Sequence, residues 1–164
     1  MATSASTPTA TPDVDWVARV RAEIDRAVQR SVKGTSYLGA GAATVGTTPK
    51  DVIHSQGTLN LYHYRPLASE IYRVPLLLVM ATTNRSYIFD LAPGQSLVEY
   101  LLKAGYDVYV MDWNPPRAEE AGLRLEDYTQ RFIPDCVRRV QEHSGVEDVN
   151  IVGYCFGGVL SLSY

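Results

Sequence analysis

The residues best suited to chemistry lie at positions 153–158, which read GYCFGG. They place the pattern Gly-x-Cys-x-Gly between an apolar run that predicts a strand and a run that predicts a helix. A sharp strand-to-helix turn of this kind, a nucleophile elbow, exposes its central side chain and requires glycine where backbones approach closely. The sequence therefore predicts Cys155 as a nucleophile, with Gly153, Gly157 and Gly158 forming the turn.

The same turn predicts half of an oxyanion hole. The backbone N–H of Phe156 points toward negative charge that develops beside Cys155, and the positive end of the following helix favours the thiolate. In elbows of this type a second N–H comes from the loop after an earlier strand. Thr83 and Asn84, in residues 81–85, are the candidates. An ordinary polar loop is the alternative, because the segment has no glycine-rich oxyanion signature.

A cysteine nucleophile also needs a histidine base and a carboxylate that orients it, and in this architecture both follow the nucleophile along the chain. Only nine residues, 156–164, follow Cys155. His54, His63 and His143 all precede it, and we predict structural or surface positions for them. We therefore expect neither the base nor its orienting acid in this sequence.

Two further residues, Asp112 and Cys136, also have an ordinary structural interpretation. Asp112, beside Trp113 at the end of a predicted strand, lies at an active-site edge or serves as a loop-forming or helix-capping carboxylate. Cys136 lies on the apolar face of a predicted helix and reads as a small core residue. A Rossmann-like phosphate loop is the alternative to the elbow, but Cys155 replaces the second glycine of that pattern. No Cys/His cluster has the spacing of a metal site.

The elements that must position these residues alternate between strands and helices. Two short strands are predicted around the turn at Gln56 and Gly57, and three continuous apolar runs predict buried strands. Helices are predicted between and after these runs, with a kink at Pro134. The strands are residues 52–55, 59–64, 75–81, 106–112 and 149–152, and the helices are 96–103, 125–143 and 159–164. This alternation predicts an α/β fold with a mostly parallel sheet and right-handed crossovers.

The composition indicates one globular domain with an N-terminal extension. The 164 residues are 46% hydrophobic and carry a formal net charge of −3, which argues against nucleic-acid binding and polybasic membrane docking. We predict a disordered tail (1–12), an amphipathic helix that packs on its own core or docks on a partner (13–33), a flexible linker (34–48) and the α/β domain (49–164). Without a signal peptide or an apolar run long enough to span a membrane, the sequence predicts a cytoplasmic protein.

Four segments together resemble the catalytic subunit of class III polyhydroxyalkanoate synthases. They are GYCFGG at 153–158, NRSY at 84–87, YDVYVMDW at 106–113 and LNLYHYRP at 59–66, within a resemblance that covers residues 48–164. It implies an α/β-hydrolase fold, of which this chain would contain only the part up to the helix after the elbow. It also implies polymerisation of 3-hydroxyacyl-CoA, with 3-hydroxybutyryl-CoA as the expected substrate, into polyester with release of CoA. Cys155 would carry the growing chain as a thioester, and no cofactor is implied because the CoA thioester is a substrate.

The resemblance also implies partners and an incomplete chain. A second synthase subunit or a second copy of the chain, and the surface of a polyester granule, are the expected partners. The family's aspartate and histidine would lie beyond Tyr164, so we expect this chain to be inactive alone, and poorly soluble because strand 149–152 is left uncovered. The alternatives are a dienelactone-hydrolase-like cysteine hydrolase, with water as the acceptor, and a non-catalytic fragment that binds the partner subunit or the granule.

Overall fold

The computed structural model describes residues 21–26 and 44–164, which belong to two compact units, Met1–Ala43 and Thr44–Tyr164. In the first unit residues 21–26 are helical, and Arg26 Nε donates to the carbonyl of Ala22 at 3.0 Å. These six residues lie inside the helix predicted over 13–33. The rest of that helix, the predicted tail 1–12 and residues 34–43 of the predicted linker lie outside the described residues.

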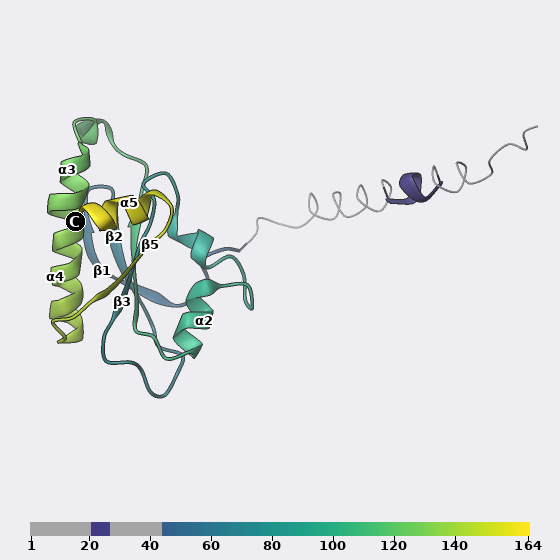
Figure 1. Cartoon of the computed structure of the whole chain (residues 1–164), viewed down its shortest axis with the longest axis horizontal. Coiled ribbons are helices and arrows are strands. Elements are labelled where there is room, and N and C mark those ends of the chain that lie inside the picture. Colours follow the sequence, from purple (N-terminus) through teal and green to yellow (C-terminus); the bar gives the residue numbers. More distant parts are fainter. Residues whose placement is uncertain (1–20, 27–43) are drawn as a thin grey trace, which may run out of the picture. The chain divides into compact units, whose positions relative to one another are not determined.

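The second unit is built on a five-stranded sheet with the order β1-β2-β4-β3-β5 (Figure 1). Its strands are β1 (Lys50–Gln56), β2 (Leu59–Tyr64), β3 (Leu76–Val79), β4 (Val108–Trp113) and β5 (Asn150–Gly153). β2 pairs antiparallel with β1 and β4, whereas β3 pairs parallel with β4 and β5. Four strands therefore share one direction and β2 opposes them. The predicted α/β sheet is confirmed, as a mixed sheet whose parallel part is formed by β3, β4 and β5.

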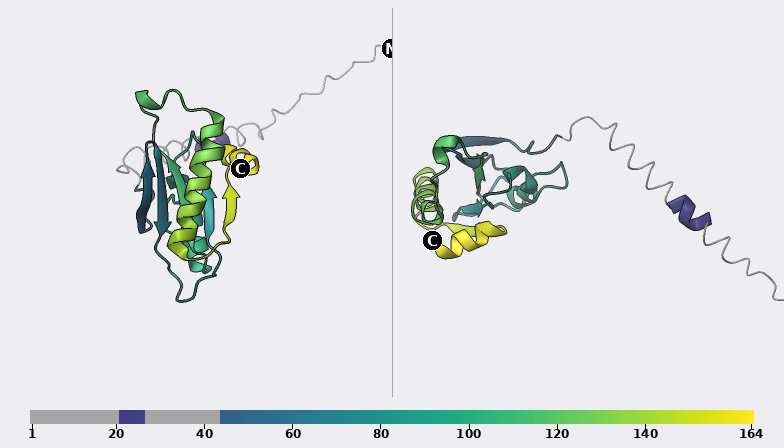
Figure 2. Two further views of the ribbon diagram at one scale, coloured as in Figure 1. Left: turned by 90° about the vertical axis from the view of Figure 1, so that its left-hand side faces the viewer. Right: turned by 90° about the horizontal axis from the view of Figure 1, so that it is seen from above.

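Helices pack on both faces of this sheet. α2 (Leu97–Lys103) begins after Ser96, whose hydroxyl accepts the N–H of Glu99 at 3.0 Å, and α4 (Ile133–Ser144) lies on the opposite face (Figures 1 and 2). α5 (Phe156–Ser163) follows β5 directly. The remaining short elements are η1 (Ser86–Phe89), η2 (Ala118–Glu120), α3 (Leu125–Asp127) and η3 (Tyr128–Phe132). The strands, helices and hairpin turn expected within residues 49–164 are thus present.

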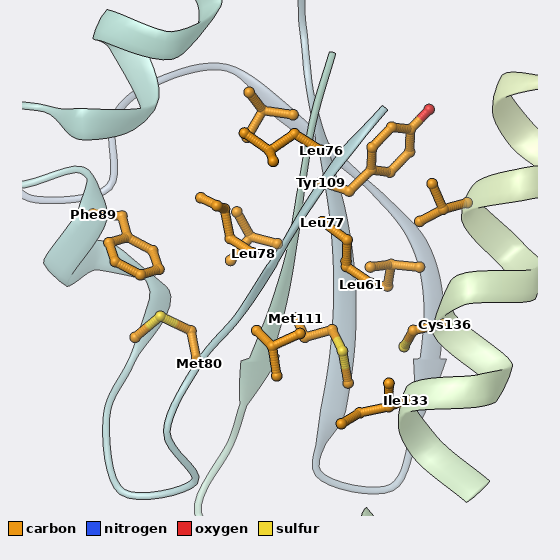
Figure 3. Packing of buried hydrophobic residues seen from close by; sticks show 14 of the residues in the cluster. Leu61, Leu76, Leu77, Leu78, Met80, Phe89, Tyr109, Met111, Ile133 and Cys136 are labelled. Carbon is orange, nitrogen blue, oxygen red and sulfur yellow. The ribbon is translucent and has the colours of Figure 1, made fainter. Parts of the chain in front are cut away.

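The core lies on both faces of β3 and β4, because successive side chains of a strand point to opposite sides. Figure 3 shows Leu77 and Met111 directed toward Ile133 and Cys136 of α4, and Leu78 directed away from that helix. Every residue of β3 and of β4 is buried. Continuous apolar runs are the expected pattern for such strands, since neither face meets water.

The helix predicted over 125–143 is interrupted near Pro134. α3, η3 and α4 follow one another without a gap, and η3 is a π-helical turn in which Ile133 N–H donates to the carbonyl of Tyr128. Proline has no N–H to donate, and its ring crowds the carbonyl four residues earlier. The irregularity predicted at Pro134 therefore takes the form of a widened turn just before it.

The compact unit begins at Thr44, ahead of the domain start expected at residue 49. Thr48 donates to the buried carboxylate of Asp90 through its N–H (2.9 Å) and its hydroxyl (2.7 Å), and Gly46 N–H donates to the Asp90 carbonyl at 2.6 Å. Burial alone would raise the pKa of Asp90, but hydrogen bonds from Thr48 and Ser96 outweigh it and the net pKa is lowered. A partner 42 residues away leaves no local signal in the sequence.

Within residues 21–26 and 44–164, none of the helices combines the length and the apolar character that a membrane crossing requires. The same residues do not gather three or more His, Cys, Asp or Glu side chains into a set that could hold a metal ion.

Candidate active site

Cys155 lies in a tight turn between the last residue of β5 and the first residue of α5. Its backbone has φ 55° and ψ −122°, and among the described residues it is the only non-glycine residue with positive φ. Such a conformation costs about 1–3 kcal/mol and persists only where the surrounding structure imposes it. The Cys155 residue is exposed. The turn therefore holds a thiol outward in a strained position.

Two of the flanking glycines are required by close backbone contacts. A Cβ at Gly153 would lie 2.4 Å from Cα of Gly158, and a Cβ at Gly157 would lie 2.1 Å from the carbonyl oxygen of Val79. Neither distance leaves room for a side chain. Gly158 differs, since a Cβ there would meet no atom closer than 3.4 Å. The backbone of Gly158 therefore packs closely against Gly153, but residue 158 itself has room for a small side chain.

The turn is fastened to the end of β3. Tyr154 N–H donates to the carbonyl of Val79 at 2.9 Å, and Gly157 N–H and Gly158 N–H donate back to the carbonyls of Tyr154 (2.9 Å) and Cys155 (3.0 Å). As the first residue of α5, Phe156 has no intrahelical acceptor for its own N–H. Its N–H lies beside Cys155 without an intrahelical partner, and its part in an oxyanion hole stays a prediction.

The loop with the other two candidate donors, residues 81–85, leaves β3 at the same place. A Cβ on Gly157 would lie 2.8 Å from the carbonyl carbon of Met80, so the first residues after β3 lie against the Cys155 turn. The loop then turns, with Asn84 N–H donating to the carbonyl of Ala81 at 3.1 Å. Thr83 is exposed and Asn84 is half-buried. Their part in an oxyanion hole stays a prediction.

Asp112 is buried at the carboxyl end of β4 and holds the far end of this loop. Its Oδ1 accepts the N–H of Ser86 at 2.7 Å, and its Oδ2 lies 3.3 Å from Nη2 of Arg85. The two carboxylate oxygens therefore face the last residue of the loop and the residue that follows it. This is the geometry expected of the loop-forming carboxylate, one of the two interpretations of Asp112 from the sequence.

All three histidines lie between the sheet and α4. His63 Nε2 lies 2.7 Å from Oδ1 of Asp107, and His143 Nδ1 lies 2.8 Å from the hydroxyl of Tyr109. His54 Nε2 lies 2.8 Å from Oδ2 of Asp135 on α4, close enough for an ion pair but not aligned as a hydrogen bond. Each imidazole thus has a neighbour in this interface, and none of them makes a hydrogen bond with Cys155.

The second cysteine is a core residue, as the sequence predicts. Cys136 is fully buried on α4 within the main hydrophobic cluster. Burial, and to a lesser extent the neighbouring Asp135 carboxylate, raises the pKa of its thiol to about 12. Only a small fraction is therefore ionised near neutral pH, and Cys136 is unsuited to be a nucleophile.

One contact near the site is missed by sequence reasoning. The indole Nε1–H of Trp113, which is buried, donates to the carbonyl of Met80 at 3.1 Å. The only signal in the sequence is general, since a buried tryptophan needs an acceptor for its N–H. Nothing in the residue pattern says that the acceptor directly follows β3, because the pairing of β3 with β4 is a property of the fold.

Comparisons with known proteins agree with this geometry. A family model described as the alpha/beta hydrolase fold matches residues 75–164, and one described as the N-terminus of poly-beta-hydroxybutyrate polymerase (PhaC) matches residues 20–101. Among curated proteins, the chain is similar to the poly(3-hydroxyalkanoate) polymerase subunits PhaC of three organisms. It is 43% identical over 121 residues to that of Haloferax mediterranei, covering 74% of this chain and 25% of the relative.

The other two relatives give the same result. The subunit of Haloarcula marismortui is 42% identical over 127 residues (73% of this chain, 27% of the relative), and that of Allochromatium vinosum is 42% identical over 131 residues (79% and 37%). The chain thus spans about a quarter to somewhat over a third of the length of these relatives. With the strand-turn-helix at Cys155 and the matches on both halves of the sequence, the chain belongs to the poly-beta-hydroxybutyrate polymerase family, within the alpha/beta hydrolase fold.

Proposed function

We propose that this chain carries the nucleophile of a poly(3-hydroxyalkanoate) polymerase, and that this nucleophile is Cys155. The observation that supports the proposal most is the strained, exposed position of Cys155 at the first turn of α5, where the turn acts as a nucleophile elbow. The names of the similar proteins supply the reaction, transfer of 3-hydroxyacyl groups into a polyester. The substrate we propose is 3-hydroxyacyl-CoA, with 3-hydroxybutyryl-CoA as the first to test.

In the first step the Cys155 thiolate attacks the carbonyl carbon of the acyl-CoA thioester. A new C–S bond forms, and the carbonyl oxygen becomes negative beside the N–H of Phe156 and an N–H from Thr83 or Asn84. The C–S bond to CoA then breaks, and the CoA thiolate leaves and takes up a proton. One thioester replaces another, so the intermediate costs little free energy and stays reactive.

In the second step a chain hydroxyl attacks the acyl group on Cys155. The hydroxyl loses its proton to a general base, an ester bond forms, and the Cys155 thiolate is released. None of the three histidines is placed to serve as that base, because each is paired at the interface with α4. We propose that the base and its orienting acid come from outside residues 44–164, and that no cofactor takes part. We also propose that the reaction runs in the cytoplasm at polyester granules. The proposed partner is a second subunit or a second copy of the chain.

The first step is the one to test, since it needs only the nucleophile and the oxyanion donors. The protein is incubated with 3-hydroxybutyryl-CoA, and the free CoA that is released is quantified by its thiol. The mass of the peptide that contains Cys155 is then measured by mass spectrometry. We expect a 3-hydroxybutyryl adduct on Cys155 with an equal amount of CoA released. Cys155→Ala should abolish both signals. Cys136→Ala, the matched control at the buried thiol, should retain both.

The products distinguish the proposal from its alternatives. Insoluble polyester that grows with CoA release supports the polymerase, whereas CoA release with only free hydroxy acid indicates a dienelactone-hydrolase-like enzyme. An unacylated Cys155 that also reacts with iodoacetamide no faster than a model thiol would contradict the nucleophile and indicate a binding fragment.

A further inference from the structure

We propose that Asp112 and Trp113, at the end of β4, are positioning residues that hold the loop 81–85 in place for oxyanion stabilisation beside Cys155. This inference rests on the proposed function, since it assigns a role within the same site. Neither side chain touches the reacting atoms in the proposed mechanism. Their effect passes through the backbone of the loop that carries Thr83 and Asn84.

The two residues hold opposite ends of the loop. Trp113 Nε1–H donates to the carbonyl of Met80, the residue just before the loop, at 3.1 Å. Asp112 Oδ1 accepts the N–H of Ser86, the residue just after the loop, at 2.7 Å. Consecutive residues of a strand point to opposite faces of the sheet, so the loop is held from both sides of β4.

Both anchors are themselves rigid. Asp112 is 1% exposed and Trp113 is 3% exposed. The Trp113 ring packs edge-on against Tyr128 and Phe132, with centroid distances of 5.1 and 5.7 Å, which fixes the direction of its N–H. A buried carboxylate that accepts a backbone N–H forms a strong, charge-assisted hydrogen bond. The end of β4 therefore places the loop with little freedom.

The carboxylate of Asp112 is better suited to positioning than to proton transfer. Oδ1 is occupied by Ser86 N–H, and Oδ2 lies 3.3 Å from the guanidinium of Arg85, which is partly exposed. The ion pair adds a second restraint at the last residue of the loop. An acceptor for a substrate proton would need an oxygen open to the substrate, and the two oxygens of Asp112 already face Ser86 and Arg85.

On its other side the loop begins against the Cys155 turn. Gly157 contacts the backbone of Val79 and Met80 so closely that a Cβ there would lie within 2.8 Å of both. The position of the loop relative to Cys155 is thus set by Gly157 on one side and by β4 on the other. Oxyanion donors act only within a narrow distance range, and a displacement of about 1 Å can cost on the order of 100-fold in rate.

The test compares two reactions of the same thiol. With p-nitrophenyl acetate, the Cys155 thiolate attacks the ester carbonyl, negative charge develops on the carbonyl oxygen, and p-nitrophenolate leaves. With iodoacetamide, the thiolate displaces iodide at a methylene carbon and no oxyanion forms. The ratio of the two rate constants therefore cancels the thiolate fraction and accessibility, and reports the oxyanion donors. Both products are assigned to Cys155 by peptide mass spectrometry.

We expect Asp112→Asn to lower the ratio of acylation to alkylation by about tenfold, a part of the roughly 100- to 1000-fold that loss of a donor costs. The alkylation rate should stay within about twofold of wild type, because the Cys155 turn is unchanged. Trp113→Phe, which keeps the ring but removes the N–H, should lower the ratio by a smaller factor. The matched control is Asp107→Asn, a buried acid just before the other end of β4, which should leave the ratio unchanged.

A ratio for Asp112→Asn equal to that of Asp107→Asn, with wild-type Cys155 acylated normally, would overturn the positioning role and leave the proposed nucleophile intact. A wild-type Cys155 that is alkylated but not acylated would contradict the proposed function itself, and this inference with it. If Asp112→Asn unfolds, Cys136 becomes alkylated as well, and Trp113→Phe then decides the question by the same ratio.

Discussion

The middle of the sheet and the edge that carries Cys155 differ in how deeply their side chains are buried. β3 and β4 are buried at every residue, whereas β5 alternates exposed and half-buried residues, and α5 leaves most of its side chains open, Leu162 at 92% exposure. The edge also contains the strained backbone of Cys155. Burial of apolar surface in the middle provides the stability that lets a strained, exposed residue persist at the edge. Four predictions test this contrast.

The largest effect is expected in the middle of the sheet. Leu77→Ala removes a fully buried side chain that packs toward α4, and should lower the free energy of unfolding by about 3 kcal/mol. Leu162→Ala, the same change on the exposed side of α5, should change it by less than about 0.5 kcal/mol. Urea unfolding followed by circular dichroism measures both. Equal losses at the two positions would show that the contrast in burial does not govern stability.

The next effect tests whether the edge depends on the middle. Gly157→Ala places a Cβ against the Val79 carbonyl, and should cost about 2 kcal/mol and detach the Cys155 turn from β3. The rate at which p-nitrophenyl acetate acylates Cys155 should fall as well, because the turn is displaced. Gly158→Ala is the matched control, because its Cβ has room and alanine favours a helix. If both variants keep wild-type stability and acylation, the close contact at Gly157 is not needed.

A smaller effect concerns the strain at Cys155. Cys155→Gly should stabilise the fold by about 1 kcal/mol, because glycine adopts positive φ without a steric cost while losing somewhat more entropy on folding. Cys155→Ala keeps the Cβ and the strain, and should leave stability nearly unchanged. Thermal unfolding of the two variants measures the difference. Equal melting temperatures would mean that the turn stores no strain at this residue.

The smallest effect depends on pH and concerns Asp90, which is buried and accepts hydrogen bonds from Gly46 and Thr48. Its folded-state pKa lies below the ordinary value of 3.8, so its contribution is complete above about pH 4 and is lost as the pH falls through the folded-state pKa. Wild type should exceed Asp90→Asn in unfolding free energy by about 0.5 kcal/mol at pH 7. The difference in unfolding free energy between wild type and Asp90→Asn should narrow as the pH falls below about 4. If the difference in unfolding free energy between wild type and Asp90→Asn does not depend on pH, the stabilising role of the Asp90 carboxylate is contradicted.

Most of the fold can be predicted because local patterns and burial agree. The runs that form β3 and β4 are continuous and apolar, which only strands covered on both faces need, and Gly145 ends α4 in the left-handed conformation at φ 70°. The Gly/Thr composition of residues 44–48 gives no sign that Gly46 and Thr48 have a hydrogen-bond partner at Asp90. Pro134 predicts an irregularity in its helix, but the residue pattern does not say that this irregularity is the π-helical turn η3.

The sequence by itself determined the turn at Cys155, since Gly-x-Cys-x-Gly between a strand and a helix specifies the close-packed glycines and the exposed position of that residue. Only the tertiary structure decided what surrounds that turn. The contact of Gly157 with Val79, the bond from Trp113 to Met80 and the hold of Asp112 on Ser86 all cross between strands or loops far apart in the chain. Such contacts depend on strand order and register, which arise from packing the whole sheet and leave no local pattern.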